Sequence, residues 1–74
     1  MKLKNIDFLI NGNGTVTLGR VGPFPCTAIA SDENQCLAML VRDPDESLVA
    51  LLERLDAAIE DAFERGIYTD EINA

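Results

Sequence analysis

The pattern of apolar and polar residues divides the chain into a strand-rich first half and a helical second half. Strands commonly alternate apolar and polar residues, and a short continuous apolar run also suits a buried strand. These patterns predict four strands, at about residues 6–10, 15–21, 26–30 and 35–41. We therefore expect an antiparallel β-meander in the first half of the chain.

The first two predicted strands flank Asn11-Gly12-Asn13-Gly14, and Asn-Gly is a strong hairpin-turn signal. The apolar pattern favours a register in which Ile10 faces Val16. In the same register Phe8 faces Leu18, so that all four side chains share one face of the sheet.

The predicted fourth strand, 35–41, is apolar on both of its alternating faces. In a simple meander this strand lies at a sheet edge, whereas two apolar faces suit a central strand or one covered by another chain. Either the strand order departs from the sequence order, or this edge meets a partner.

A helix is predicted over residues 44–65. Asp43 is placed at its N-cap, Pro44 at the first helical position and Glu46 at the third, which is the capping-box arrangement. Apolar residues recur at helical spacing as far as Gly66, a C-terminal stop; they are Leu48, Leu51, Leu52, Leu55, Ile59, Ala62 and Phe63. We expect the tail, 67–74, to fold back and extend the core; the alternatives are a frayed terminus or a peptide that orders on binding.

Together these elements predict an α+β fold in a single small domain over residues 1–74. Three or four antiparallel strands are followed by one long amphipathic helix that packs on one face of the sheet. Folding so short a chain buries a thin core, so part of the stability is expected to come from a partner.

Composition limits the chemistry that is open to this chain. It contains no histidine, which excludes His-based catalytic triads. Cys26 and Cys36 lack metal-ligand spacing, so we expect both to be small buried hydrophobic residues. No catalytic residue, metal or cofactor is predicted. A disulfide between the two cysteines is disfavoured, which suits a reduced cytoplasmic protein. The apolar run near the N-terminus is too short for an export signal or a membrane segment.

The charge is concentrated in the second half of the chain. The net charge is −7, and residues 43–74 hold ten acidic and only two basic side chains. Such a charge disfavours direct binding to nucleic acid or to anionic lipid.

Three glutamates recur every seven residues along the predicted helix, and a fourth follows four residues later. We call these four the acidic ridge, defined as Glu46, Glu53, Glu60 and Glu64. Asp56 flanks this ridge. One interpretation is a solvated face that maintains solubility, and the other is a docking surface for a basic partner. The candidate partner-binding residues are Glu53, Asp56, Glu60, Glu64 and Phe24, although Phe24, which lies between two prolines, also suits a lid over the core.

We therefore expect a non-enzymatic interaction protein that binds a partner protein, either as a homodimer through the fourth strand or through the acidic helix. The alternative is an inhibitor or antitoxin-like regulator of the phage or mobile-element type, in which the acidic helix mimics nucleic acid. In general layout the passage from Val41 to Phe63 resembles HicB-type antitoxin domains, and small acidic sheet-plus-helix proteins include anti-CRISPR proteins. No diagnostic motif of either group is present, so the sequence assigns no family.

Overall fold

A computed structural model describes residues 2–73 of the chain and confirms the predicted α+β class. Its elements follow in the order α1 (Lys4–Asn11), β1 (Thr15–Val21), β2 (Phe24–Ser31), β3 (Cys36–Val41), α2 (Leu48–Arg65) and β4 (Thr69–Asp70). The four strands form one sheet in the order β1-β2-β3-β4. The first three are antiparallel, and β4 runs parallel to β3.

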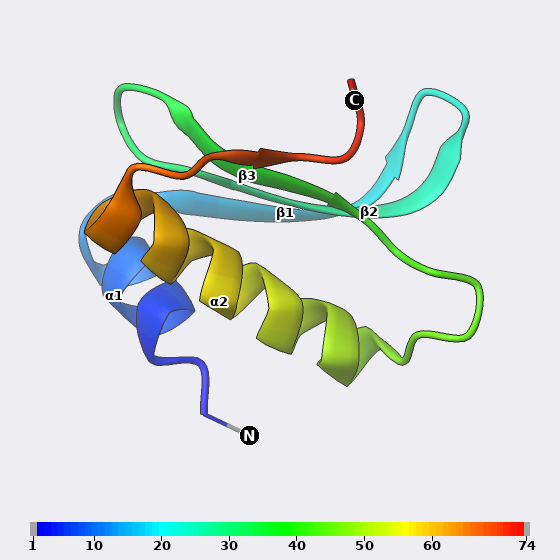
Figure 1. The fold of residues 1–74 in the computed structure, drawn as a ribbon, viewed down its shortest axis with the longest axis horizontal. Coiled ribbons are helices and arrows are strands. Elements are labelled where there is room, and N and C mark those ends of the chain that lie inside the picture. Colours follow the sequence, from blue (N-terminus) through cyan, green and yellow to red (C-terminus); the bar gives the residue numbers. More distant parts are fainter. Residues whose placement is uncertain (1, 74) are drawn as a thin grey trace.

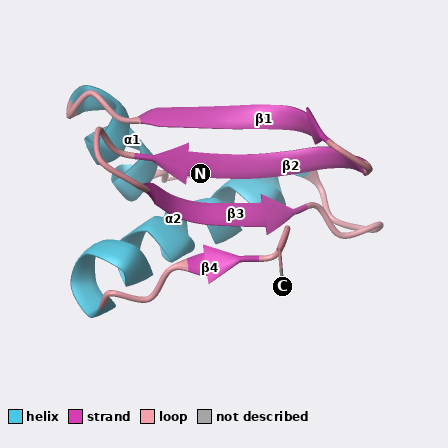
Figure 2. Cartoon of the chain, turned by 90° about the horizontal axis from the view of Figure 1, so that it is seen from above, coloured by secondary structure: helices cyan, strands magenta, loops and turns pink. Residues whose placement is uncertain are grey.

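Both helices lie on the same face of the sheet (Figure 1). Figure 2 shows the four strands side by side with the helices beneath them. The buried apolar side chains come from α1, β2, β3 and α2; they are Leu9, Ala28, Ala30, Leu37, Ala38, Leu40, Leu51, Leu55, Ala58, Ile59 and Ala62. Many are alanines, whose small side chains allow α2 to lie close to the sheet.

The segment predicted as a strand at 6–10 is instead part of the helix α1, so that prediction was wrong. Ile6 and Leu9, three residues apart, turn toward the core as on an amphipathic helix, and Leu9 is buried. The Asn-Gly segment ends this helix: the backbone N–H groups of Gly12 and Gly14 both donate to the carbonyl oxygen of Leu9. Gly and Asn are also the residues that favour helix C-termini, so the turn signal could not distinguish the two outcomes.

The hairpin register predicted from that strand is wrong for the same reason. Val16 pairs with Ala30, and Leu18 pairs with Ala28. The strands predicted at 15–21, 26–30 and 35–41 are all present as β1, β2 and β3, with β2 extended at both ends.

The strand β3 is internal to the sheet, a position that suits an apolar strand, although the helices cover only one of its two faces. The strand order follows the sequence, but the tail adds β4 along the outer side of β3, with Ala38 opposite Thr69 and Met39 opposite Asp70. The tail thus folds back as expected, although it extends the sheet and leaves Ile67 and Tyr68 exposed. The doubly apolar pattern therefore no longer requires a second chain against β3.

The helix α2 begins at Leu48, later than predicted. The hydroxyl of Ser47 accepts a hydrogen bond from the backbone N–H of Ala50 and caps the helix. Half of the predicted capping box forms: Asp43 N–H donates to Glu46 Oε1 at 3.0 Å, but Glu46 N–H donates to the carbonyl oxygen of Asp43 instead of its side chain. The two bonds close a turn before the helix. At the other end, Gly66 adopts the left-handed conformation (φ 67°) that the stop signal predicted.

Within the described residues, neither helix combines the length and the apolar character that crossing a membrane requires.

Candidate interaction surface

Asp56 was predicted to flank the acidic ridge in solvent, but the structure buries it between α2 and α1. Its Oδ1 accepts hydrogen bonds from the backbone N–H groups of Asn5 (2.8 Å) and Ile6 (2.9 Å). Its Oδ2 accepts a third from the side-chain amide of Asn5 at 3.0 Å. No side chain of α1 caps its own N-terminus. Asp56 therefore serves as the cap of α1, although it lies on another helix and about 50 positions away in sequence.

Glu60 lies one turn further along α2 and is only partly free. It accepts a hydrogen bond from the side-chain amide of Asn5 at 3.2 Å, and the exposed ammonium group of Lys4 lies 3.9 Å away. Glu60 therefore combines a contact to α1 with remaining acceptor capacity toward solvent.

Glu46, the first member of the acidic ridge, is engaged in an ion pair with Arg54. The Arg54 Nε donates to one carboxylate oxygen at 2.7 Å, and Nη2 donates to the other at 3.0 Å. The hydrogen bonds from Arg54 lower the pKa of Glu46 from 4.5 to about 2, with a smaller contribution from the backbone of Asp43. The same pairing raises the pKa of Arg54.

Arg54 also connects the tail and the sheet. Its Nη1 donates to Glu71 Oε2 at 2.8 Å, and its Nη2 donates to the carbonyl oxygen of Val41 at 2.9 Å. The other carboxylate oxygen of Glu71 accepts the backbone N–H of Val41. No sequence pattern predicted this cluster. The only signal is that residues 43–74 contain ten acidic side chains and two basic ones, of which Arg54 is one.

Glu53 and Glu64 remain exposed on α2, as predicted. Two of the candidate residues on α2, Asp56 and Glu60, thus contact α1. The other two, Glu53 and Glu64, lie on either side of this α1–α2 contact and are exposed to solvent. Asp61 lies beside them and pairs with Arg65, with 2.6 Å between Oδ1 and Nη1.

Two exposed aromatic rings lie near the C-terminal end of α2, which carries Glu60 and Glu64. Phe8 of α1 is 69% exposed, and its ring meets that of Phe63 edge-on with 6.0 Å between centroids. A shallow pocket of about 420 Å³ is lined by Asn5, Phe8, Phe63 and Glu64. We call Phe8 and Phe63 the aromatic pair. Phe8 was not predicted to lie at the surface, because the predicted strand at 6–10 placed its side chain on the apolar face of the sheet.

Phe24, the remaining candidate, does not join this group. It is half-buried at the start of β2, opposite Val21, beside the β1–β2 turn. In Figure 1 that turn lies at the end of the molecule opposite α1. Phe24 therefore cannot contact the same small ligand as the aromatic pair.

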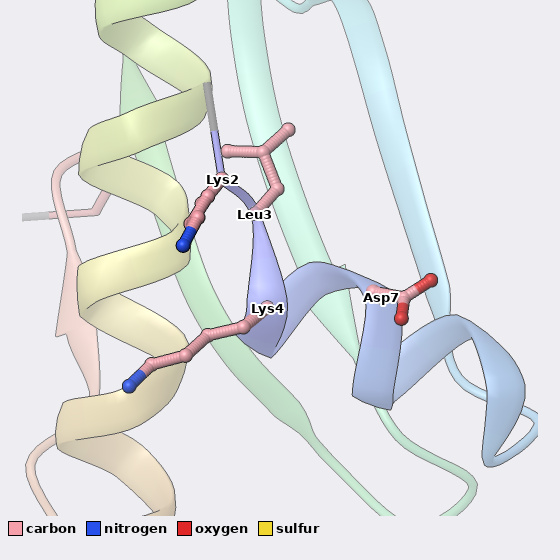
Figure 3. A pocket seen from close by; sticks show the side chains of 4 residues that line it. All are labelled: Lys2, Leu3, Lys4 and Asp7. Atoms are coloured by element: carbon pink, nitrogen blue, oxygen red, sulfur yellow. The ribbon is translucent and has the colours of Figure 1, made fainter.

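A second pocket lies at the start of α1 and is lined by Lys2, Leu3, Lys4 and Asp7. Figure 3 shows that the ammonium groups of both lysines extend toward α2, away from the carboxylate of Asp7. These charged groups therefore do not converge on one point.

The two cysteines occupy different environments. Both were expected to be buried, but Cys26 is only partly buried against the core, and Cys36 is exposed at the start of β3. Both are free thiols, and they lie at opposite ends of the β2–β3 pairing, since Cys36 is opposite Ser31 and Cys26 precedes Thr27.

Comparison of the chain with known protein families, with curated proteins and with solved structures gives no match.

Proposed function

We propose that this protein acts without catalysis of its own, by binding a partner protein that presents an apolar residue among basic ones. The observation that carries the proposal is the aromatic pair, which lies exposed beside Glu60 and Glu64. Exposed aromatic side chains are frequent centres of protein interfaces, because they bury a large area at little conformational cost.

The surrounding charge supports the choice of a basic partner. Glu60 and Glu64 stand one turn apart on α2, Asp7 is exposed on α1 next to Phe8, and the whole chain carries a net charge of −7. An acidic border around an apolar centre accelerates association with a cationic partner and disfavours an acidic one. The proposed binding surface therefore consists of the aromatic pair with Glu60 and Glu64, and Glu53 extends its acidic side.

Mimicry of nucleic acid by the full acidic ridge has less support. Glu46 pairs with Arg54 and Asp56 caps α1, so neither is available to represent a phosphate group. Only Glu53, Glu60 and Glu64 remain for such an array.

The test is affinity capture from the native host with mass-spectrometric identification, using the wild type and two matched variants. Phe8→Ser removes the exposed ring of the proposed surface, and Val49→Ser removes another exposed apolar side chain, at the other end of α2. We expect Phe8→Ser to lose the captured partner and Val49→Ser to retain it. Equal capture by all three proteins would contradict the proposal.

A second arm tests the charge. Glu53→Lys combined with Glu64→Lys reverses two carboxylates that have no structural partner among the described residues. We expect weaker capture at low salt, because the steering of a basic partner is lost. If the captured protein binds nucleic acid, competition by duplex DNA for the same site would favour mimicry instead.

A further inference from the structure

The outer edge of β1 presents backbone groups that no other described strand pairs with. β1 is one of the two edge strands of the sheet and hydrogen-bonds to β2 alone, whereas the other edge strand, β4, is only two residues long. From Thr15 to Gly19 its residues pair one by one with β2, and beyond Gly19 (φ 138°) the register shifts. A regular stretch of five residues, centred on Thr17, is therefore available to pair with a further strand.

The face of β1 that continues the core is incompletely covered. Val16 and Leu18 pair with Ala30 and Ala28, which are fully buried, so all four lie on the helix-covered face of the sheet. Leu18 is nevertheless 44% exposed. Figure 2 shows α1 near the start of β1 and α2 beneath the neighbouring strands, so the helices leave the later part of β1 uncovered.

Charge distinguishes this edge from the rest of the molecule. Residues 8–31 contain Arg20 and no acidic residue, although the whole chain carries a charge of −7. Two copies that met through α2 would bring their carboxylates together, whereas two copies that met through β1 would keep them apart. The edge of β1 is therefore a place where a second copy of this chain can approach at low electrostatic cost.

We propose that β1 pairs with β1 of a second copy in antiparallel orientation, around a two-fold axis at Thr17, to form a continuous sheet across the dimer. In this register Val16 lies opposite Leu18 of the second copy, and Leu18 lies opposite its Val16. Both apolar pairs extend the core face, and a Thr17–Thr17 pair forms on the open face.

The residues that flank the paired stretch are also complementary. Arg20 follows it directly and comes near Gly14 of the second copy, in the turn that follows α1. The last turn of α1 contains no basic residue, and the carbonyl groups at a helix C-terminus favour a nearby cation. Arg20 makes no ion pair with any described residue of its own chain.

The first test is the solution mass by size-exclusion chromatography with light scattering. We expect the wild type to have twice the chain mass of 8.1 kDa and Leu18→Lys to be monomeric. The control is Leu48→Lys, since Leu48 is 45% exposed on α2 and undergoes the same chemical change away from the edge. A wild-type monomer at every concentration, or a Leu18→Lys protein that remains dimeric, would overturn the proposal; far-ultraviolet circular dichroism verifies that each variant is folded.

The second test addresses the register in a background in which Cys26 and Cys36 are replaced by Ala and Ser. A two-fold axis at Thr17 brings the two Thr17 Cα atoms to about 5 Å, within disulfide range. Thr17→Cys should therefore form a disulfide-linked dimer on mild oxidation. Thr15→Cys should not, because the two Thr15 residues lie about 13 Å apart along the strands. Equal cross-linking of both variants, or cross-linking of Thr15→Cys alone, would refute the register.

Discussion

At the scale of single residues, Asp56 determines how the N-terminal helix is held. Its carboxylate accepts the backbone N–H groups of Asn5 and Ile6 in a largely buried position, with only 9% of the residue exposed. Helical spacing places Asp56 correctly next to the acidic ridge, but spacing within one helix does not indicate which distant segment reaches it. Its structural role depends on a contact between positions about 50 residues apart, which no local pattern encodes.

Asp56→Ala should reduce the free energy of unfolding by about 2 kcal/mol, because it leaves two backbone donors of α1 without their acceptor. Glu53→Ala, on the exposed side of the same helix, should change it by less than about 0.5 kcal/mol. Urea denaturation followed by circular dichroism measures both values. Equal stability of the two variants would show that Asp56 does not cap α1.

The ion pair between Glu46 and Arg54 should make part of the free energy of unfolding sensitive to acid. Its pKa falls from 4.5 to about 2 on folding, since Arg54 stabilises the charged form. A lowered folded-state pKa stabilises the protein above the unfolded value, and this contribution is lost as the pH falls through the folded one. Between about pH 5 and pH 2 the free energy of unfolding should thus fall more steeply in the wild type than in Glu46→Gln. Parallel slopes in pH-dependent urea titrations would contradict the assignment.

At the scale of elements, the long helix, β1, β2 and β3 could be predicted from local patterns, whereas α1 and β4 could not. Residues 6–10 are short and apolar enough for either a strand or a helix, and the Asn-Gly segment after them ends either element. The tertiary contact to Asp56 favours the helix. The short strand β4 is held by Arg54 through Glu71, a side-chain interaction with no sequence periodicity.

A substitution at Gly14 tests how closely the end of α1 packs against the segment that leads into β1. A Cβ atom at this position would clash with the Leu9 side chain and lie 2.8 Å from the Leu9 carbonyl oxygen. Gly14→Ala should therefore destabilise the fold by about 1–3 kcal/mol through overpacking. Gly12→Ala is the control, because the nearest atom to its Cβ would be the Phe8 carbonyl oxygen at 3.4 Å. Thermal denaturation should rank Gly14→Ala well below Gly12→Ala, and the reverse order would contradict this packing.

At the scale of the whole molecule, the charge is divided between two surfaces. The acidic side chains lie mainly on α2 and its flanking segments, and the sheet edge at β1 carries only Arg20. The surface proposed for a basic partner lies at the α1–α2 contact, where the aromatic pair is found. The edge proposed for a second copy lies on β1, so the two proposed surfaces are separate. The sequence revealed the division of charge, but it could not show that β1 is the longer of the two sheet edges, because that depends on the tail adding the two-residue strand β4 beside β3.

If β1 joins two copies, unfolding is linked to dissociation, and the melting temperature depends on protein concentration. The melting temperature of the wild type should rise as its concentration is increased, and that of Leu48→Lys should rise in the same way. That of Leu18→Lys should stay constant, because a monomer unfolds independently of concentration. The aromatic-pair variant Phe8→Ser should behave like the wild type, since its ring lies on α1, outside the proposed strand pairing. A concentration dependence that Phe8→Ser abolished and Leu18→Lys preserved would assign self-association to the α1–α2 surface instead of the sheet edge.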